Sequence, residues 1–312
     1  MHVLVAGAGA LGSVFGGFLR RAGCAVTLLG RGPHLSAIAR NGLHITGIWG
    51  EHHVDEFVVC EGVPPTRADV ILLATKSYDT QKMIEQVASC LAPDGVVISL
   101  QNGLGNVEII EAAMSPDRTL GARVIFGVEV VEPGCARITV YADRVLIGSR
   151  HAGRYPKLDQ LAREWAARFD AAGIPSAYTD DIEAALWEKV FYNAALNPLG
   201  ALLGVSYGRL SEQSDTRAIM DAVIDEAFAI ARAEGIRVTW PTAEAYRAAF
   251  YDRLVPSTFD HRSSMLQDLE RGRRTEIDAI NGAIWRRGQA HGIVTPVNET
   301  LARLMRYREQ RR

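Results

Sequence analysis

The chain has 312 residues, of which 48% are hydrophobic and 22% are charged, and its formal net charge at pH 7 is -2. This length suits two domains or one large one, and the composition is that of an ordinary globular protein. The near-neutral charge provides no basic footprint for nucleic acid or for an anionic membrane, so we expect neither as a partner.

The cysteines point to a reducing compartment. Cys24, Cys60, Cys90 and Cys135 are widely spaced and form no CxxC pair, which argues against a zinc site and against a disulfide framework. Met1 runs straight into an apolar segment without a basic region, so no signal peptide is predicted, and no stretch is long and apolar enough to span a membrane. We expect a cytoplasmic protein without a bound metal.

A strand, a glycine turn and a helix are predicted over residues 2–23, which read HVLVAGAGALGSVFGGFLRRAG. Gly7, Gly9 and Gly12 form a GxGxxG pattern in the context that it requires, between an apolar strand and an apolar helix. The first glycine permits the tight turn, the second lets a pyrophosphate approach the backbone, and the third lets helix and strand pack closely. The pattern therefore favours a dinucleotide site over a mere strand–helix turn.

The second predicted strand, AVTLLGR, ends at Arg31. NAD-binding folds usually carry an acidic residue about 20 positions after the glycines, where it binds the ribose 2′-hydroxyl. A guanidinium there suits a 2′-phosphate, which favours NADP(H) over NAD(H). The alternative is an ordinary surface arginine.

Two more strands, ADVILLATK and GVVISLQNG, are each followed by a helical pattern, which predicts βα units of a doubly wound sheet. Ligands of such sheets bind at the carboxyl ends of the strands, and Arg31, Lys76 and Asn102 all fall there. Lys76 suits a phosphate or ribose, and Asn102 suits the nicotinamide ribose or the substrate. Taken singly, each is as well explained as a loop residue. Residues 119–148 contain short β runs broken by turns, which predicts an antiparallel extension of the sheet.

The second half of the chain reads as helical, and we place the domain boundary between residues 178 and 179. Residues 187–202, WEKVFYNAALNPLGAL, are apolar nearly all round but carry Lys189, Asn193 and Asn197 four residues apart. Polar groups on a buried helix need partners. The line is either a structural network or, beside a nicotinamide cofactor, the wall of a substrate cleft. Pro198 is expected to kink this helix and to free a backbone carbonyl beside Asn197.

A further polar cluster lies in residues 260–285. Ser264 and Asp268 are four apart on one predicted helix face, which Gly272 ends. Thr275 is predicted to cap the next helix, with Glu276 in its first turn. The alternative for Glu276 is an acid that merely favours a helix start.

Six segments in series resemble the ketopantoate reductase (2-dehydropantoate 2-reductase) family. They are GAGALG at 7–12, Arg31, TKSYDT at 75–80, LQNGLGN at 100–106, WEKVFYNAALNPL at 187–199 and SSMLQDLERGRRTEID at 263–278. The match runs through both halves in order, and only the whole series is specific for the family. One departure is Gly200, where threonine is expected in many members.

The resemblance implies a Rossmann-type NADP-binding domain over residues 1–178 and an all-α catalytic domain over 179–312. It implies NADPH as cofactor and a small 2-oxo acid as substrate. Lys189 is similar to the family's catalytic lysine and general acid, and Glu276 to the acid that holds the substrate hydroxyl. The implied substrate ligands are Asn102, Asn193, Asn197, Ser264 and Asp268. The implied cofactor ligands are Gly7, Ala8, Gly9, Ala10, Leu11, Gly12, Arg31, Lys76 and Asn102.

The resemblance thus implies reduction of ketopantoate to pantoate, in pantothenate and coenzyme A biosynthesis. Rival hypotheses are a paralogous reductase of another 2-oxo acid, an NADP-dependent 3-hydroxyacid dehydrogenase and a non-catalytic NADPH sensor. The segment at 263–278 argues against the second rival, and the clustering of Lys189, Asn193 and Glu276 argues against the third. A homodimer is an alternative that the sequence leaves open.

Overall fold

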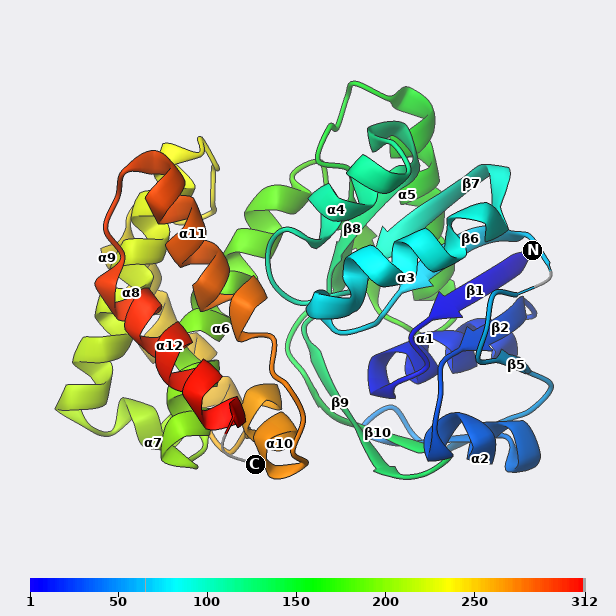
Figure 1. Cartoon of the computed structure of the whole chain (residues 1–312), viewed down its shortest axis with the longest axis horizontal. Helices are drawn as coiled ribbons and strands as arrows, with labels where there is room; N and C mark the ends of the chain where they lie inside the picture. The colour runs from blue at the N-terminus through cyan, green and yellow to red at the C-terminus, as the bar shows by residue number, and fades with distance from the viewer. Residues whose placement is uncertain (65, 311–312) are drawn as a thin grey trace. The chain divides into compact units, whose positions relative to one another are not determined.

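The computed structural model describes residues 1–64 and 66–310. The chain divides into two compact units (Figure 1). Unit 1 comprises Met1–Gln101 and Asn106–Ile182, and unit 2 comprises Asn102–Gly105 and Glu183–Arg312. The boundary suggested by the sequence, after residue 178, lies four residues before this division. No local pattern indicated that Asn102–Gly105 belongs to the second unit.

Unit 1 is built on a largely parallel sheet. Its strands are β1 His2–Ala6, β2 Ala25–Leu29, β5 Val58–Cys60, β6 Ala68–Leu73, β7 Leu91–Ser99, β8 Thr119–Arg123, β11 Val145–Gly148 and β12 Ser176–Tyr178. Among the described residues their order is β12-β11-β8-β7-β6-β1-β2-β5. Only the β11–β8 pair is antiparallel. The predicted doubly wound sheet with an antiparallel extension is confirmed.

Helices cover both faces of this sheet, because its central strands are apolar on both sides. In β1, Val3 and Val5 join the core under helices α1 Ala10–Arg21 and α5 Pro156–Ala171. The alternate residues Leu4 and Ala6 join a second core under α3 Thr80–Val87 and α4 Asn106–Ala113. Helix α2, Pro33–Asn41, packs against the first core. The short 3-10 turns are Ser77–Asp79, Ala88–Cys90 and Pro116–Arg118.

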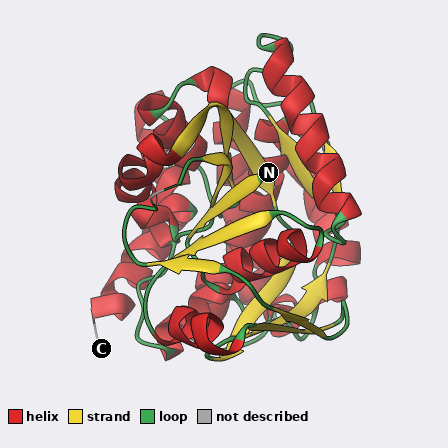
Figure 2. Cartoon of the chain, turned by 90° about the vertical axis from the view of Figure 1, so that its right-hand side faces the viewer, coloured by secondary structure: helices red, strands yellow, loops and turns green. Residues whose placement is uncertain are grey.

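A second, four-stranded sheet packs on α1. It consists of β3 Leu43–Gly47, β4 His52–Val54, β9 Phe126–Glu132 and β10 Cys135–Tyr141, in the order β4-β3-β10-β9 (strands are yellow in Figure 2). The β9–β10 hairpin therefore leaves the main sheet, whereas the sequence suggested that all of 119–148 extends it. The physical reason is an aromatic contact: Phe126 stacks on Phe15 of α1 with ring centroids 5.9 Å apart.

Unit 2 consists of helices joined by turns and loops, with no strand among its described residues from Glu183 onward, as predicted. The helices are α6 Ile182–Leu203, α7 Tyr207–Ser211, α8 Ser214–Ala233, α9 Ala243–Ala249, α10 Ser264–Glu270, α11 Asn281–His291 and α12 Pro296–Gln310. Shorter turns are a π-helical one at Phe250–Leu254 and 3-10 turns at Pro256–Thr258 and Ile277–Ala279 (η6). None of the helices in the described part of the chain is long and apolar enough to cross a membrane.

Helix α6 runs through the core of unit 2, and Pro198 does not end it. Proline at this position removes the N–H that would bond the carbonyl of Ala194, four residues earlier. That carbonyl accepts a hydrogen bond of 3.0 Å from Nδ2 of buried Asn281. The carbonyl that the sequence predicted to be freed is thus satisfied by a side chain from α11.

Candidate functional site

The polar line of α6 is buried, as its apolar surroundings predict. Asn193 and Asn197 are only 8% and 3% exposed, and Lys189, one turn earlier, is partly buried. Four-residue spacing keeps the three side chains along one side of the helix. A partly buried ammonium and two buried carboxamides need hydrogen-bond partners. Lys189 has a protein partner, whereas the two asparagines have donors that bond no protein group in the described residues.

Lys189 is joined to Asn102. Its Nζ donates to Asn102 Oδ1 at 2.5 Å, across 87 positions of sequence. Asn102 belongs to unit 2, and the loop that follows it is tied to η6: Leu104 N–H donates to Ala279 O at 2.8 Å. Gly103 makes this approach possible, since its φ is +86° and a Cβ there would lie 2.4 Å from Ala279 O.

Asn102 also reaches the buried carboxylate of Glu276. Its Nδ2 donates to Glu276 Oε2 through a long hydrogen bond of 3.4 Å. Glu276 is 5% exposed. One carboxamide therefore links an ammonium to a carboxylate, its oxygen toward the first and its nitrogen toward the second. Such an arrangement can present Lys189 as a proton donor and Glu276 as a hydrogen-bond acceptor to one small polar ligand.

The segment that presents Glu276 is held from both sides by α12. Thr275 donates to Glu309 Oε1 through its N–H at 2.7 Å and through its hydroxyl at 2.5 Å. Asp278 accepts from Arg306 Nε at 2.8 Å. The sequence suggested Glu276 in the first turn of a helix capped by Thr275. In the structure Glu276 itself precedes the short turn η6, and α11 begins only at Asn281.

Asn193 and Asn197 leave donors unused by the protein. Asn197 Oδ1 accepts from the Tyr207 hydroxyl at 2.5 Å. Within the described part of the chain, no protein group bonds the side chain of Asn193 or the Nδ2 of Asn197. Neither carboxamide contributes an atom to the fully buried, unpartnered polar atoms of the described residues, so these donors keep some contact with solvent. Donors that the protein leaves available on a largely buried helix can serve a ligand, which favours a ligand-binding role over the structural network that the sequence left open.

The cluster on α10 is divided between structural and ligand-facing roles. Ser263, not Ser264, caps the helix, because its hydroxyl accepts from Leu266 N–H at 3.0 Å. Ser264 is the first helical residue and is partly exposed. Asp268 is buried and pairs with Arg273, its carboxylate oxygen 2.8 Å from the guanidinium. The pair accounts for Asp268 as a structural residue, while its substrate role stays a prediction.

In unit 1, the glycine loop has the features that a dinucleotide needs. A Cβ at Gly7 would lie 2.6 Å from Thr75 N, and one at Gly12 would lie 2.1 Å from Gly7 O, so both glycines are required by packing. A Cβ at Gly9 would meet nothing within 4 Å, so that position faces open space. Gly9 precedes α1 and provides no side-chain cap, which leaves the N–H groups of Ala10, Leu11 and Gly12 in the free first turn of the helix.

Arg31 and Lys76 follow the strands as predicted. Arg31 is exposed after β2, and the N–H groups of Gly7 and Ala8 both donate to Leu29 O, which ties the end of β2 to the glycine loop. Lys76 precedes the turn after β6. The loop before it is fixed by Gln101, whose Nε2 donates to Thr75 O at 3.0 Å. These residues fit a dinucleotide phosphate at the loop and a 2′-phosphate at the exposed guanidinium.

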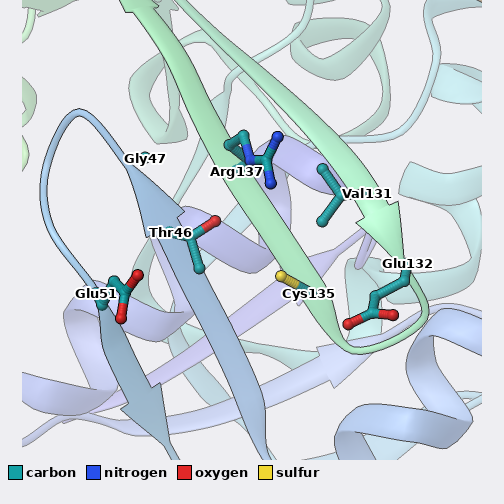
Figure 3. Close-up of a pocket in the computed structure, with 7 residues that line it drawn as sticks. All are labelled: Thr46, Gly47, Glu51, Val131, Glu132, Cys135 and Arg137. Carbon is teal, nitrogen blue, oxygen red and sulfur yellow. The ribbon is translucent and has the colours of Figure 1, made fainter.

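A depression of about 460 Å³ on the small sheet is lined by none of the predicted site residues (Figure 3). It is lined by Thr46, Gly47, Glu51, Val131, Glu132, Cys135 and Arg137. Its glutamates and its arginine do not reproduce the chemistry at Lys189. Among the described residues, no group of three or more His, Cys, Asp or Glu side chains is placed to hold a metal ion.

Sequence reasoning missed four residues that shape the site. Ser263, Tyr207, Asn281 and Glu309 contact Asn197, Ala194 or Thr275 directly. Ser263 had a local signal, since a serine before an apolar helical run is a typical cap. Asn281 and Glu309 lie 87 and 34 positions from their partners, and Tyr207 lies ten positions from Asn197 but outside its helix, so no local pattern indicated these contacts. Gly200, where the resemblance expects threonine, lies close to Val205: a Cβ there would be 3.2 Å from Val205 O.

Comparisons with known proteins cover the whole chain. The family models described as ketopantoate reductase PanE/ApbA and its C-terminal part match residues 3–151 and 181–309. A 2-dehydropantoate 2-reductase of Aquifex aeolicus is 38% identical over 313 residues, which is 99% of this chain and 97% of the relative.

Two solved structures extend these comparisons. A PanE/ApbA family ketopantoate reductase from Ralstonia eutropha JMP134 has a TM-score of 0.87 at 35% identity, covering 100% of this chain and 99% of the other. A D-mandelate dehydrogenase with NADH and anilino(oxo)acetate has a TM-score of 0.89 at 28% identity and the same coverage.

Proposed function

The chain belongs to the ketopantoate reductase family, and we propose that it reduces 2-dehydropantoate to pantoate with NADPH, in pantothenate and coenzyme A biosynthesis. The observation that carries this proposal is the chain of contacts from Lys189 through Asn102 to Glu276, beside a buried Asn193 that has no protein partner in the described residues. These groups suit a small acid that has a carbonyl, a carboxylate and a hydroxyl.

Lys189 is the proposed general acid. When bound, NADPH supplies the hydride that the C2 carbonyl carbon receives. Negative charge then develops on the carbonyl oxygen, where the Lys189 ammonium stabilises it and delivers the proton. The lysine recovers its proton from solvent, so the overall change is addition of a hydride and a proton. A positioned general acid typically contributes about 10²–10⁴ in rate.

The remaining groups orient the substrate. The Glu276 carboxylate accepts a hydrogen bond from the 4-hydroxyl of ketopantoate. The amides of Asn193 and Asn197, with the Ser264 hydroxyl, donate to the carboxylate. Asn102 holds the side chains of Lys189 and Glu276 in fixed positions relative to each other, because its carboxamide forms a hydrogen bond with each. Asp268 supports the end of α10 through its pair with Arg273.

The proposed cofactor ligands belong to unit 1 except Asn102, which belongs to unit 2. The backbone of Gly7, Ala8, Gly9, Ala10, Leu11 and Gly12 holds the pyrophosphate, Arg31 the 2′-phosphate, and Lys76 a phosphate or ribose. Arg31→Ala is expected to raise the KM for NADPH about 10- to 100-fold and to change the KM for NADH little, because only NADPH has the 2′-phosphate. Steady-state kinetics with both cofactors measures this. Arg40→Ala, another exposed arginine of unit 1, is the control.

The deciding experiment follows NADPH oxidation by absorbance, with ketopantoate against a panel of 2-oxo and 3-oxo acids. A kcat/KM for ketopantoate of about 10⁴ M⁻¹s⁻¹ or more is expected. Strong turnover of a 3-oxo acid alone contradicts the proposal. Tight NADPH binding without any turnover identifies a sensor and also contradicts it.

The similarity to D-mandelate dehydrogenase favours one second candidate, a reductase of another 2-oxo acid. Lys189, Asn102 and Asn193 would play the same parts, and the residue that distinguishes the two candidates is Glu276. An aromatic 2-oxo acid without a 4-hydroxyl makes no use of that carboxylate. Preferred turnover of phenylglyoxylate, measured in the same panel, establishes this second candidate.

We also propose a cytoplasmic homodimer. The four cysteines are unpaired, as expected in a reducing compartment. On α12, Leu304 and Tyr307 are 47% and 52% exposed, which gives unit 2 an apolar patch suited to a second copy. Light scattering coupled to size exclusion tests this, and a monomer at micromolar concentration contradicts it.

A further inference from the structure

The amide of Asn197 is oriented by a tyrosine. Tyr207, the first residue of α7, donates its hydroxyl to Asn197 Oδ1 at 2.5 Å. The tyrosine is 3% exposed, and its ring packs edge-on against Tyr192 at 5.7 Å between centroids. The hydroxyl bonds Asn197, a proposed substrate ligand, so its effect on the substrate is expected to pass through the asparagine.

The direction of this hydrogen bond is fixed by burial. A buried O–H must donate to an acceptor, or the cost is on the order of 1–3 kcal/mol. Asn197 Oδ1 is the acceptor that the described residues offer. Burial raises the pKa of Tyr207 well above its usual range, so the group remains a neutral donor at any pH at which the protein functions. If the amide turned over, its NH₂ could donate to the phenolic oxygen, but the buried O–H would lose the acceptor that Oδ1 provides.

The backbone around Asn197 is held as firmly as its side chain. The Ser263 hydroxyl donates to Asn197 O at 3.2 Å. One residue further, Pro198 restricts the chain, and Asn281 bonds the carbonyl that Pro198 leaves free. With the main chain held and Oδ1 engaged by Tyr207, Nδ2 is the side-chain group without a protein partner in the described residues, and Nδ2 is a donor.

We propose that Tyr207 is a positioning residue that holds the Asn197 amide with its nitrogen toward the substrate, and so selects an anionic oxygen there. The inference rests on the proposed function, because it takes the ligand of Asn197 to be the carboxylate of the 2-oxo acid. A reversed amide would present an oxygen to that carboxylate and repel it. Tyr207 thus makes the site selective for the acid over its neutral ester or amide.

Tyr207→Phe removes the hydroxyl and keeps the ring. The variant is expected to raise the KM for the 2-oxo acid about tenfold, to leave kcat within about threefold, and to leave the KM for NADPH unchanged. The KM for the methyl ester of the same acid should rise less than twofold, since a neutral ester loses little when the amide turns over.

Tyr192→Phe is the matched control. Tyr192 is also a largely buried tyrosine, and its hydroxyl bonds Thr258 rather than a proposed substrate ligand. The control should lose similar thermal stability but keep the acid-to-ester selectivity. If both variants change the KM equally, the effect is one of packing, and the positioning role is wrong.

A double-mutant cycle tests whether Tyr207 acts through Asn197. In an Asn197→Ala background, Tyr207→Phe should add less than twofold to the KM, because the amide that it orients is gone. A full tenfold increase in the KM overturns the inference.

The substrate is the 2-oxo acid that the unmodified enzyme reduces best. Failure of the unmodified enzyme to reduce any 2-oxo acid overturns the proposed function, whereas an active enzyme with an unaffected Tyr207→Phe variant overturns only the role of Tyr207.

Discussion

The glycine loop of unit 1 and the polar line of α6 in unit 2 (Lys189, Asn193 and Asn197) provide hydrogen-bond donors by different means. Both must offer hydrogen bonds to a polar ligand within an apolar surrounding. The loop does so with backbone N–H groups at the start of a helix. Its glycines contribute because they have no Cβ that would meet the neighbouring backbone or the ligand. The line does so with side chains, each of which needs support from elsewhere in the fold.

The difference shows in the sequence distances that each region spans. All the proposed phosphate-binding N–H groups of the loop lie within residues 7–12. The atoms of Leu29 and Thr75 that the loop contacts are backbone atoms. Lys189 depends on Asn102 across 87 positions, and Asn102 reaches Glu276 across 174. A backbone site therefore tolerates changes around it, whereas a side-chain site is only as rigid as its most distant partner.

The largest effect is expected at the centre of the line. Lys189→Met should lower kcat by about 10²–10⁴, because it removes the proton donor and the charge that stabilises the developing oxyanion. The affinity for NADPH should change less than threefold. Stopped-flow measurement of a single turnover, with fluorescence titration of the cofactor, separates the two quantities. Lys157→Met, which removes an exposed lysine of unit 1, is the control. A loss of NADPH binding with kcat intact would contradict the assignment.

A pair of glycine variants tests the loop in the same manner. Gly9→Ala should fold normally, because its φ of -85° suits alanine and its Cβ meets no protein atom, but its methyl group should block the pyrophosphate. The Kd for NADPH is expected to rise about 10- to 100-fold at an unchanged melting temperature. Gly7→Ala should instead unfold the domain, because φ is +110° and the Cβ would meet Thr75 N. Titration calorimetry and circular dichroism measure both, and equal stability losses would show that Gly9 is merely structural.

What could be predicted from the sequence follows the same division. The strand–glycine–helix unit, the position of Arg31 and the helical second half each have a local cause, in periodicity or in turn chemistry. The polar line was visible because three polar residues at helical spacing interrupt an apolar run. Its supports were not visible, since Tyr207, Asn281 and Glu309 are ordinary residues whose roles depend on tertiary contacts. The small sheet was missed for the same reason: its strands β3 and β10 pair over about 90 positions of intervening chain.

The support of α6 by Asn281 is the next test, with an effect on stability. Asn281→Ala leaves Ala194 O and Asn298 Oδ1 without their donor and should lower the free energy of unfolding by about 1–3 kcal/mol. Adding Pro198→Ala should recover part of this loss, because residue 198 regains an N–H that can bond Ala194 O within the continuous helix. Urea unfolding monitored by tryptophan fluorescence measures both variants. If the second substitution lowers stability further, the pairing of Asn281 with the proline is not what holds the helix.

The smallest effect concerns the segment that presents Glu276. Partial burial alone would raise the pKa of Asp278, but its hydrogen bonds with Arg306 and Arg274 outweigh this and lower the pKa below its ordinary value. Because the folded-state pKa is the lower one, Asp278 contributes stability above its unfolded pKa of about 3.9. That contribution is lost as the pH falls through the folded pKa.

Asp278→Asn should therefore be less stable than the unmodified protein at pH 7, and the difference should shrink below about pH 4. Melting temperatures between pH 3 and pH 7 measure the convergence, with Asp252→Asn, an acid on the π-helical turn of unit 2, as the control. At pH 7 the same variant should raise the KM for the 2-oxo acid more than the KM for NADPH, because Asp278 anchors the turn that follows Glu276. A melting-temperature difference that persists at pH 3 would mean that the ionised carboxylate is not what α12 holds, and that Thr275 and Glu309 carry the support alone.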